Sequence, residues 1–224
     1  MTWTKNILKY HFGLKTNIPL PDSVEWLFPY ENEETKRCMT EFYDRFYNDR
    51  KQRVILLGIN PGRFGAGVTG VPFTDPVLLE TACQISNDFH KRRELSSAFV
   101  YEFINALGGV EQFCHNFYIT SICPLGFIKD GKNYNYYDSR ALQEAVLPMI
   151  LDNLKTQISF GASTEVAYSM GKGKNFKFLK ALNDKYKLFE RVVALPHPRW
   201  VMQYKLKLKD TFVEEYVTAL GGHL

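Results

Sequence analysis

The chain has 224 residues, of which 45% are hydrophobic, and its formal net charge is +4. This length and composition are typical of one globular α/β domain, or at most two small ones, with enough apolar residues for a core that needs no disulfide staples. The weak positive charge is compatible with a polyanionic partner but is not diagnostic of one.

Cysteine spacing and hydropathy argue against several classes of protein. No pair among Cys38, Cys83, Cys114 and Cys123 has C-x-x-C spacing, so neither a zinc site nor an iron–sulfur cluster is expected. Four free thiols fit an intracellular, reducing location. The N-terminal stretch MTWTKNILKYHFGLK lacks the apolar core of a signal peptide. No stretch approaches the roughly 20 apolar residues that a membrane span needs.

The first third of the chain predicts a helix that leads into a buried strand. Residues 1–30 hold three prolines and scattered aromatic residues, so we expect them to wrap the domain as a loop or short helix. Glu31–Asn48 has apolar residues at three- and four-residue spacing, which predicts a helix. Val54–Ile59 is an apolar run without polar alternation, which predicts a strand buried on both faces.

A dense turn follows this strand, and it is the most informative stretch of the sequence. It contains Asn60, Pro61, Gly62, Gly65, Gly67 and Gly70. Glycine allows positive φ and leaves room where a Cβ would clash, so the turn favours backbone close to a ligand. A plain surface loop is the alternative. No Gly-Lys-Ser/Thr follows, and the G-x-G-x-x-G spacing fails, so neither a P-loop nor a dinucleotide site is predicted.

Helices and loops fill most of the remaining sequence. Helices are predicted at Pro76–Ile85, Ser96–Leu107, Ser139–Lys155, Asn175–Tyr186 and from Asp210 to Leu220. A charged loop is predicted at 87–93 and an exposed loop at 130–138. We expect Ser96 or Ser97 to cap one helix and Asp210 to cap the last. Pro148 is expected to kink or split the helix that contains it.

Three further strands complete the expected sheet. They are Phe117–Ile122, Gln157–Phe160 ending at Gly161, and Arg191–Leu195, with a short helix from Ser163-Thr164-Glu165 to about Gly171. Short apolar strands that alternate with helical segments predict a parallel sheet. The expected fold class is therefore α/β, with residues 1–224 forming a single three-layer α/β/α domain around a four-stranded, mostly parallel sheet.

Informative residues lie at or near the end of each predicted strand. They are Asn60, Ser121, Gly161 and His197. Because ligands of open α/β sheets bind at the carboxyl ends of the strands, Asn60 and His197 are expected to meet across one cleft. No carboxylate pair, Ser/His/Asp triad or metal cluster occurs at these ends. An amide with an imidazole suits chemistry that stabilises a leaving anion.

Three motifs of this sequence carry a family resemblance. GINPGRFGAGVTGVPF resembles the first active-site motif of the uracil-DNA glycosylase superfamily, and is most similar to the single-strand-selective monofunctional branch. ITSICPLGF resembles the family's strand that leads into C-P-L, and LPHPR its H-P-containing second motif. The resemblance runs from about residue 54 to about residue 200, in the family's order.

The resemblance implies a mechanism and a base pocket. Such enzymes extrude the damaged nucleotide from the stack. Asn60 would hold the attacking water, His197 would donate a hydrogen bond to the departing base, and Phe73 would stack on it. The alternatives are that Asn60 is a turn residue, that His197 is a structural histidine and that Phe73 fills the core. The implied catalytic residues are Asn60 and His197. The implied base pocket comprises Gly58, Ile59, Pro61, Gly62, Phe64, Ala66, Phe73 and Ser121.

The resemblance also implies a DNA-contacting segment after His197. The family places there a wedge that enters the vacated stack. The corresponding DNA-binding residues are Arg63, Arg199, Trp200, Val201, Met202 and Lys205. A solvated charged face is the alternative for the run of lysines that begins at Lys205.

Two departures from the family pattern concern the base, and a third concerns the wedge. The family usually has Asn where this chain has Ser121, and that Asn reads uracil through two hydrogen bonds. A single serine hydroxyl cannot make this paired contact. Ala66 replaces a common Met and enlarges the pocket, while H-P-R-W replaces the common H-P-S-P-R. A roomier pocket would admit other deaminated bases, such as xanthine or hypoxanthine.

The prediction is therefore a monofunctional DNA glycosylase of base excision repair that removes uracil, and by this argument further deaminated bases, and leaves an abasic site. The matching motifs contain no lysine to form a Schiff base, which predicts no lyase activity. The expected partner is single- or double-stranded DNA. No cofactor, metal or membrane is expected, and the chain is expected to be a monomer, cytoplasmic with the nucleoid if bacterial. Alternatives are a catalytically weak relative that binds damaged or single-stranded DNA, and a flavodoxin-like small-molecule binder.

Overall fold

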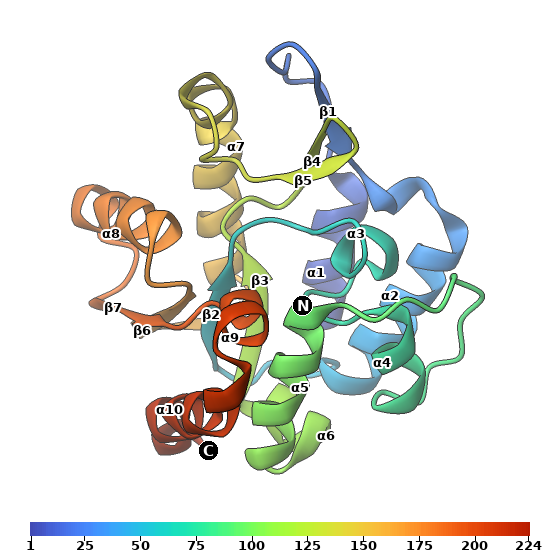
Figure 1. Cartoon of the computed structure of the whole chain (residues 1–224), viewed down its shortest axis with the longest axis vertical. Coiled ribbons are helices and arrows are strands. Elements are labelled where there is room, and N and C mark those ends of the chain that lie inside the picture. The colour runs from blue at the N-terminus through green and yellow to red at the C-terminus, as the bar shows by residue number, and fades with distance from the viewer.

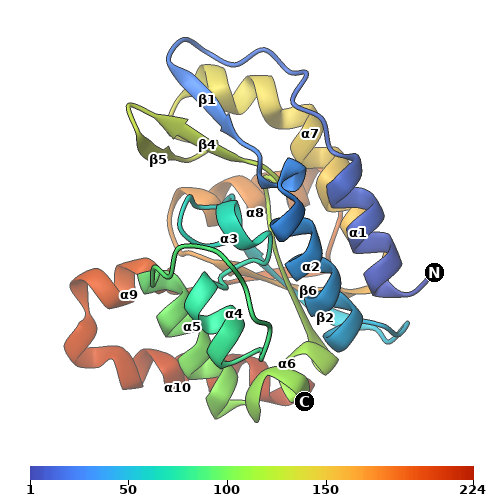
Figure 2. The same cartoon turned by 90° about the vertical axis from the view of Figure 1, so that its right-hand side faces the viewer.

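A four-stranded parallel sheet forms the centre of the molecule (Figures 1 and 2). The computed structural model describes residues 1–224. The strand order is β3 (Phe117–Ser121), β2 (Arg53–Gly58), β6 (Ala162–Met170), β7 (Arg191–Leu195). Every residue of β2 is buried, as expected for a central strand covered on both faces. The predicted α/β fold class is confirmed.

Helices surround this sheet and supply the outer layers. Those of at least six residues are α1 (Trp3–Gly13), α2 (Glu33–Phe46), α4 (Pro76–Thr81), α5 (Leu95–Ala106), α6 (Gly109–Asn116), α7 (Arg140–Ile158), α8 (Lys174–Tyr186), α9 (Pro198–Tyr204) and α10 (Lys209–Leu220). The four-residue α3 (Ala66–Thr69) lies in the turn after β2, and the 3₁₀ turns are η1 (Pro29–Glu31), η2 (Leu206–Leu208) and η3 (Gly221–His223). Helices α7 and α8 pack on β6, and α6 packs on β2 and β3. None of these helices is both long and apolar enough to cross a bilayer.

A small antiparallel sheet at one end of the molecule was not predicted. It consists of β1 (Val24–Leu27), β4 (Gly126–Lys129) and β5 (Lys132–Tyr134), with β4 in the middle. The expected loop at 130–138 is thus partly a hairpin. Its turn is Asp130-Gly131, both with positive φ, which is the Asp-Gly pattern of two-residue hairpin loops. Residues 1–30 likewise contain a full helix and a paired strand.

The prediction for residues 157–171 was wrong. Gln157 is fully buried on the inner face of α7, where its Nε2 donates to Asn153 Oδ1 over 2.5 Å. The third strand starts at Ala162 instead and includes Ser163-Thr164-Glu165, which we had expected to start a helix. A short apolar run can belong to a buried helix face as well as to a strand. Pairing of β6 with two neighbours decides its conformation, and such tertiary context overrides local propensity.

Several expected helix details also differ. Helix α5 begins before the serines, with Glu94 as the residue that precedes it, and Leu208 rather than Asp210 precedes α10. Helix α7 continues through Pro148. Helix α9, which begins at Pro198 directly after His197, was not predicted. These differences concern helices only, and the order of the strands is unaffected.

The N-terminal helix buries a histidine against α2 and η1. His11 is 4% exposed, packs edge-on against Tyr10 and lies beside Tyr30. Neither ring nitrogen has a hydrogen-bond partner. Burial lowers the pKa of His11 to about 4. The folded state therefore keeps this ring neutral at pH values where an unfolded chain already binds a proton.

This histidine makes stability depend on pH in a defined direction. The unfolded chain protonates His11 near pH 6.5 and the folded chain only near pH 4, so the free energy of unfolding decreases as pH falls through this window. We expect the wild type to lose about 2 kcal/mol from this group between pH 7.5 and pH 5. His11→Leu should lack this loss, and urea unfolding of both proteins at the two pH values measures it. Equal pH dependence in the two proteins would contradict the assignment.

Candidate active site

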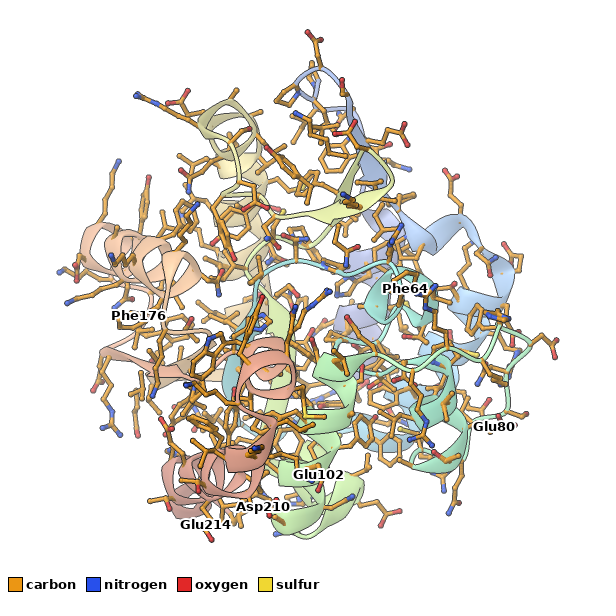
Figure 3. All side chains as sticks on the ribbon, in the orientation of Figure 1. Phe64, Glu80, Glu102, Phe176, Asp210 and Glu214 are labelled. Carbon is orange, nitrogen blue, oxygen red and sulfur yellow. The ribbon has the colours of Figure 1, made fainter.

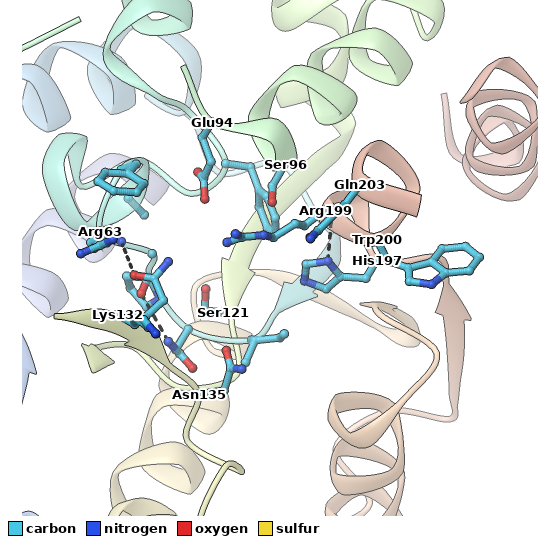
Figure 4. Close-up of a pocket in the computed structure, with 18 of the residues that line it drawn as sticks. Arg63, Glu94, Ser96, Ser121, Lys132, Asn135, His197, Arg199, Trp200 and Gln203 are labelled. Atoms are coloured by element: carbon cyan, nitrogen blue, oxygen red, sulfur yellow. Dashed lines mark hydrogen bonds between the residues drawn. The ribbon is translucent and has the colours of Figure 1, made fainter. Parts of the chain in front are cut away.

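The carboxyl ends of β2, β3 and β7 border one cleft of about 570 Å³ (Figure 4). The register pairs Gly58 of β2 with Ser121 of β3, and Met170 of β6 with Leu195 of β7. The cleft is lined by Ile59, Asn60, Pro61, Gly62, Arg63, Phe64, Ala66, Phe73, Glu94, Ser96, Ser121, Lys132, Asn133, Asn135, Tyr137, His197, Arg199, Trp200, Gln203 and Tyr204. The expected meeting of Asn60 and His197 across one cleft is confirmed.

Three backbone groups fix the amide of Asn60. Its Nδ2 donates to the carbonyl oxygens of Pro61 at 3.3 Å and Tyr134 at 3.4 Å. Its Oδ1 accepts from the backbone N–H of Tyr136 at 3.2 Å. Both amide hydrogens are therefore used, whereas Oδ1 keeps one lone pair. The side chain is held as a fixed acceptor at the edge of the cleft.

The geometry of His197 selects one neutral tautomer. Its Nδ1 accepts the backbone N–H of Arg199 at 3.1 Å and thereby caps the first turn of α9. Burial, with a smaller effect from Arg199, lowers the pKa of His197 to about 4. A neutral imidazole that accepts at Nδ1 carries its proton on Nε2. His197 is thus a neutral hydrogen-bond donor at physiological pH.

Phe73 lies directly over the end of β2. A Cβ built on Gly58 would come within 2.9 Å of Phe73 Cε2, so only glycine leaves room for the ring. Phe73 itself has a φ of +52°, which is unusual for a bulky residue and indicates that its surroundings hold it there. Gly58 therefore does not line the cleft but lies under the aromatic side chain that does.

Buried amides tie the strand ends together behind the cleft. Asn175 Nδ2 donates to Gly58 O and to Ser169 Oγ, both at 3.4 Å, and its Oδ1 accepts from Tyr136 Oη at 2.8 Å. Asn153 of α7 donates to the carbonyl oxygen of Ser121 at 2.9 Å. These contacts join β2, β6, β3 and the segment that orients Asn60.

The charges of the cleft are mostly positive. Arg63, Lys132 and Arg199 line it, and the guanidinium groups of Arg63 and Arg92 lie 4.5 Å and 3.6 Å from the ring centroid of Phe64. Figure 3 shows Glu102, Asp210 and Glu214 on α5 and α10, away from Phe64. Glu94 provides the only carboxylate among the lining residues.

Several lining residues escaped sequence reasoning. Asn133 accepts the backbone N–H of Arg63 with its Oδ1 at 3.0 Å, and Asn135 and Tyr137 lie beside it on the segment that we had expected to be an exposed loop. The Asp-Gly turn signal would have revealed their hairpin. No local pattern marked Glu94, which precedes α5 and reaches the cleft only through the tertiary fold.

The segment after His197 needs correction. Val201 is fully buried in the core, so it cannot lie on the DNA-facing surface that we expected for it. Met202 is half-buried and packs against the same core. Trp200 is exposed, and Lys205 Nζ lies 5.7 Å from its ring centroid. Gly161 precedes β6 and does not line the cleft, whereas Gly171, which follows β6, lies against His197.

Comparison with known proteins assigns the family. The sequence profile described as "Uracil DNA glycosylase superfamily" matches residues 45–221. The chain belongs to the uracil DNA glycosylase superfamily. The crystal structure of wild-type SMUG2 from Pedobacter heparinus is similar over 99% of this chain and 98% of that chain, with 43% sequence identity and a TM-score of 0.95.

Superfamily membership confirms the resemblance that the three motifs indicated, and the name of the matched structure agrees with the branch. The chain is accordingly placed among DNA glycosylases, hydrolases of DNA repair. The four cysteines are free, as predicted, and all four are buried.

The close approach at Gly58 leads to a test of the aromatic side chain above it. Gly58→Ala should push the Phe73 ring out of place, because the new Cβ would overlap it. Overpacking of this kind costs about 1–3 kcal/mol. We expect excision activity to fall by roughly 10-fold or more while the fold persists, measured by single-turnover excision and thermal unfolding. Gly13→Ala, where nothing lies within 4 Å, is the control. Unchanged excision by the Gly58 variant would contradict the positioning role.

Proposed function

We propose that the chain is a monofunctional DNA glycosylase that hydrolyses the N-glycosidic bond of flipped-out uracil and of the deaminated purines hypoxanthine and xanthine. The observation that carries this proposal is the pairing of a fixed amide acceptor, Asn60, with a neutral imidazole donor, His197, at one cleft. The proposed partner is DNA that contains a deaminated base.

Asn60 would bind the attacking water through its free Oδ1 lone pair. The water donates one hydrogen to Oδ1, so its own lone pair can turn toward C1′ of the sugar. The amide is too weak a base to deprotonate the water early. The reaction therefore depends on departure of the base, with water adding to a sugar that already carries positive charge.

His197 would stabilise the base as it departs. The electron pair of the glycosidic bond moves to the base, and Nε2–H donates to the oxygen or nitrogen that gains this charge. A neutral donor in a site from which water is largely excluded is effective because its dipole is already oriented. The low pKa of the ring, about 4, keeps it in this form throughout the neutral range.

The breadth of the proposed base range follows from the wall of the cleft. Ser121 has one hydroxyl where a paired amide contact would select uracil, while Gly62 and Ala66 leave space beside it. A pocket with a paired amide contact rejects a wrong base, because that base would leave the polar groups of the pocket unpaired. A pocket without this contact loses that discrimination. Shape, stacking on Phe73 and the donor at His197 would then recognise several deaminated bases.

The two catalytic roles predict distinct defects. Asn60→Ala should lower single-turnover excision of uracil by about 10³-fold, and His197→Ala by about 10²-fold, because each removes a group that acts mainly in the transition state. Binding of uracil-containing DNA, measured by fluorescence anisotropy, should change little. His90→Ala, an exposed histidine in a loop, is the matched control. A 3-fold change in rate corresponds to only roughly half a kcal/mol of activation free energy. A variant that keeps its activity within this limit would refute the catalytic role of the residue it lacks.

The base range and the absence of lyase activity can be measured in one assay. Oligonucleotides with uracil, hypoxanthine or xanthine, single-stranded and paired, are incubated with the protein and resolved with and without alkali. We expect strand breaks only after alkali and no covalent adduct with borohydride, because a Schiff base needs a suitably placed amine. Lys132 lines the cleft, so Lys132→Ala tests any adduct that does form. Binding without release of any base would favour a DNA-binding relative instead.

A further inference from the structure

Glu94 is the one acidic residue that lines the cleft, and the mechanism above leaves it unused. A carboxylate in a DNA-binding cleft repels phosphate, so its presence among Arg63, Lys132 and Arg199 needs an explanation. Asp75 caps α4 and accepts the backbone N–H of Glu94 at 2.9 Å, which fixes the backbone. This contact does not involve the carboxyl group of Glu94, which points into the cleft (Figure 4).

The position of this carboxyl group is built into the fold. Glu94 precedes α5 but makes no hydrogen bond to the N–H groups of that helix. A Cβ on Gly65 would lie 2.2 Å from Glu94 Oε2, and a Cβ on Gly62 would lie 3.3 Å from Oε1. Oε2 accepts the hydroxyl of Ser97 at 3.2 Å, whereas Oε1 has no protein hydrogen-bond partner. Two glycines of the first motif thus make room for a carboxyl group with one free oxygen.

Glu94 and His197 approach the cleft from different sides. The Glu94 carboxyl lies against Gly62 and Gly65 in the turn after β2, whereas His197 lies against Gly171 at the end of β6. Figure 4 shows Arg199 between the two side chains. A base that presents O2 of uracil, or N3 of a purine, to His197 turns its other edge toward Glu94. In uracil that edge carries only C–H groups, but in a purine it carries N7, a hydrogen-bond acceptor.

We propose that Glu94 is a catalytic residue for deaminated purines, donating a hydrogen bond and then a proton to N7 of the departing base. This inference rests on the proposed function, since it assumes that purines are substrates. The electron pair of the C1′–N9 bond goes to the purine, and the carboxyl proton goes to N7. The water oxygen bonds to C1′ and its surplus proton goes to solvent, from which Glu94 is protonated again.

The surroundings of Glu94 shift the pKa of its carboxyl group upward. Burial raises the pKa of the Glu94 carboxyl, and the neighbouring Asp75 raises it further, while Ser97 and Arg199 act in the opposite direction. Arg63 and Lys132 are the other charged groups of the cleft. A carboxylic acid with a raised pKa is suited to general acid catalysis near neutral pH.

The test compares two bases in one protein preparation. In single-turnover assays, Glu94→Ala should lower hypoxanthine excision by roughly 10²-fold and Glu94→Gln by roughly 10-fold, because an amide can donate a hydrogen bond but no proton. Uracil excision should change less than about 3-fold in both variants, since uracil has no N7 to protonate. The assay uses hypoxanthine as the purine, because xanthine itself ionises near neutral pH. Glu111→Gln removes an exposed charge on α6 and serves as control.

A pH profile separates proton donation from packing. In the wild type the hypoxanthine-to-uracil rate ratio should fall as pH rises through the pKa of Glu94, and in Glu94→Gln the ratio should stay constant. Equal losses for both bases, or unchanged hypoxanthine excision, would overturn the role of Glu94 while leaving the proposed function intact. A wild type that releases uracil but no purine would instead refute the purine part of the proposed function, and this inference with it.

Discussion

The buried amide of Asn175 is the contact on which the arrangement of the cleft depends. It bonds the end of β2, the end of β6 and the hydroxyl of Tyr136, whose backbone N–H orients Asn60. Parallel strands bring their carboxyl ends to one edge, but they leave the loops beyond those ends undetermined. A fully satisfied buried network supplies the missing constraint, because each broken bond would leave an unpaired polar group in the interior.

The same edge of the sheet holds two groups of opposite character. Asn60 and His197 have one tautomer or orientation each, set by backbone groups, and neither needs to change charge near neutral pH. Glu94 differs, since burial raises the pKa of its carboxyl group and Asp75 raises it further. In the proposed mechanism the site combines a fixed dipolar part that suits any departing base with a titratable part that distinguishes bases by the edge opposite His197.

Much of the fold and part of the site could be predicted locally. Apolar runs and the alternation of strands with helices indicated a four-stranded parallel sheet, and β2, β3 and β7 lie within a residue of their expected bounds. Asn60, Ser121 and His197 were expected at strand ends and line one cleft. The third strand was misplaced because the buried face of α7 and the strand β6 both present short apolar runs, which only their packing distinguishes.

The sequence by itself determined the family, the glycine-rich turn after the first strand and the residues at three of the four strand ends, because these depend on neighbours along the chain. Tertiary structure alone decided that Glu94, which precedes α5, and Asn133, Asn135 and Tyr137, from β5 and the segment after it, complete the cleft. It also decided that Val201 faces the core while Trp200 faces solvent. Such outcomes depend on contacts between distant segments, and no local spacing encodes which side chains those contacts bring together.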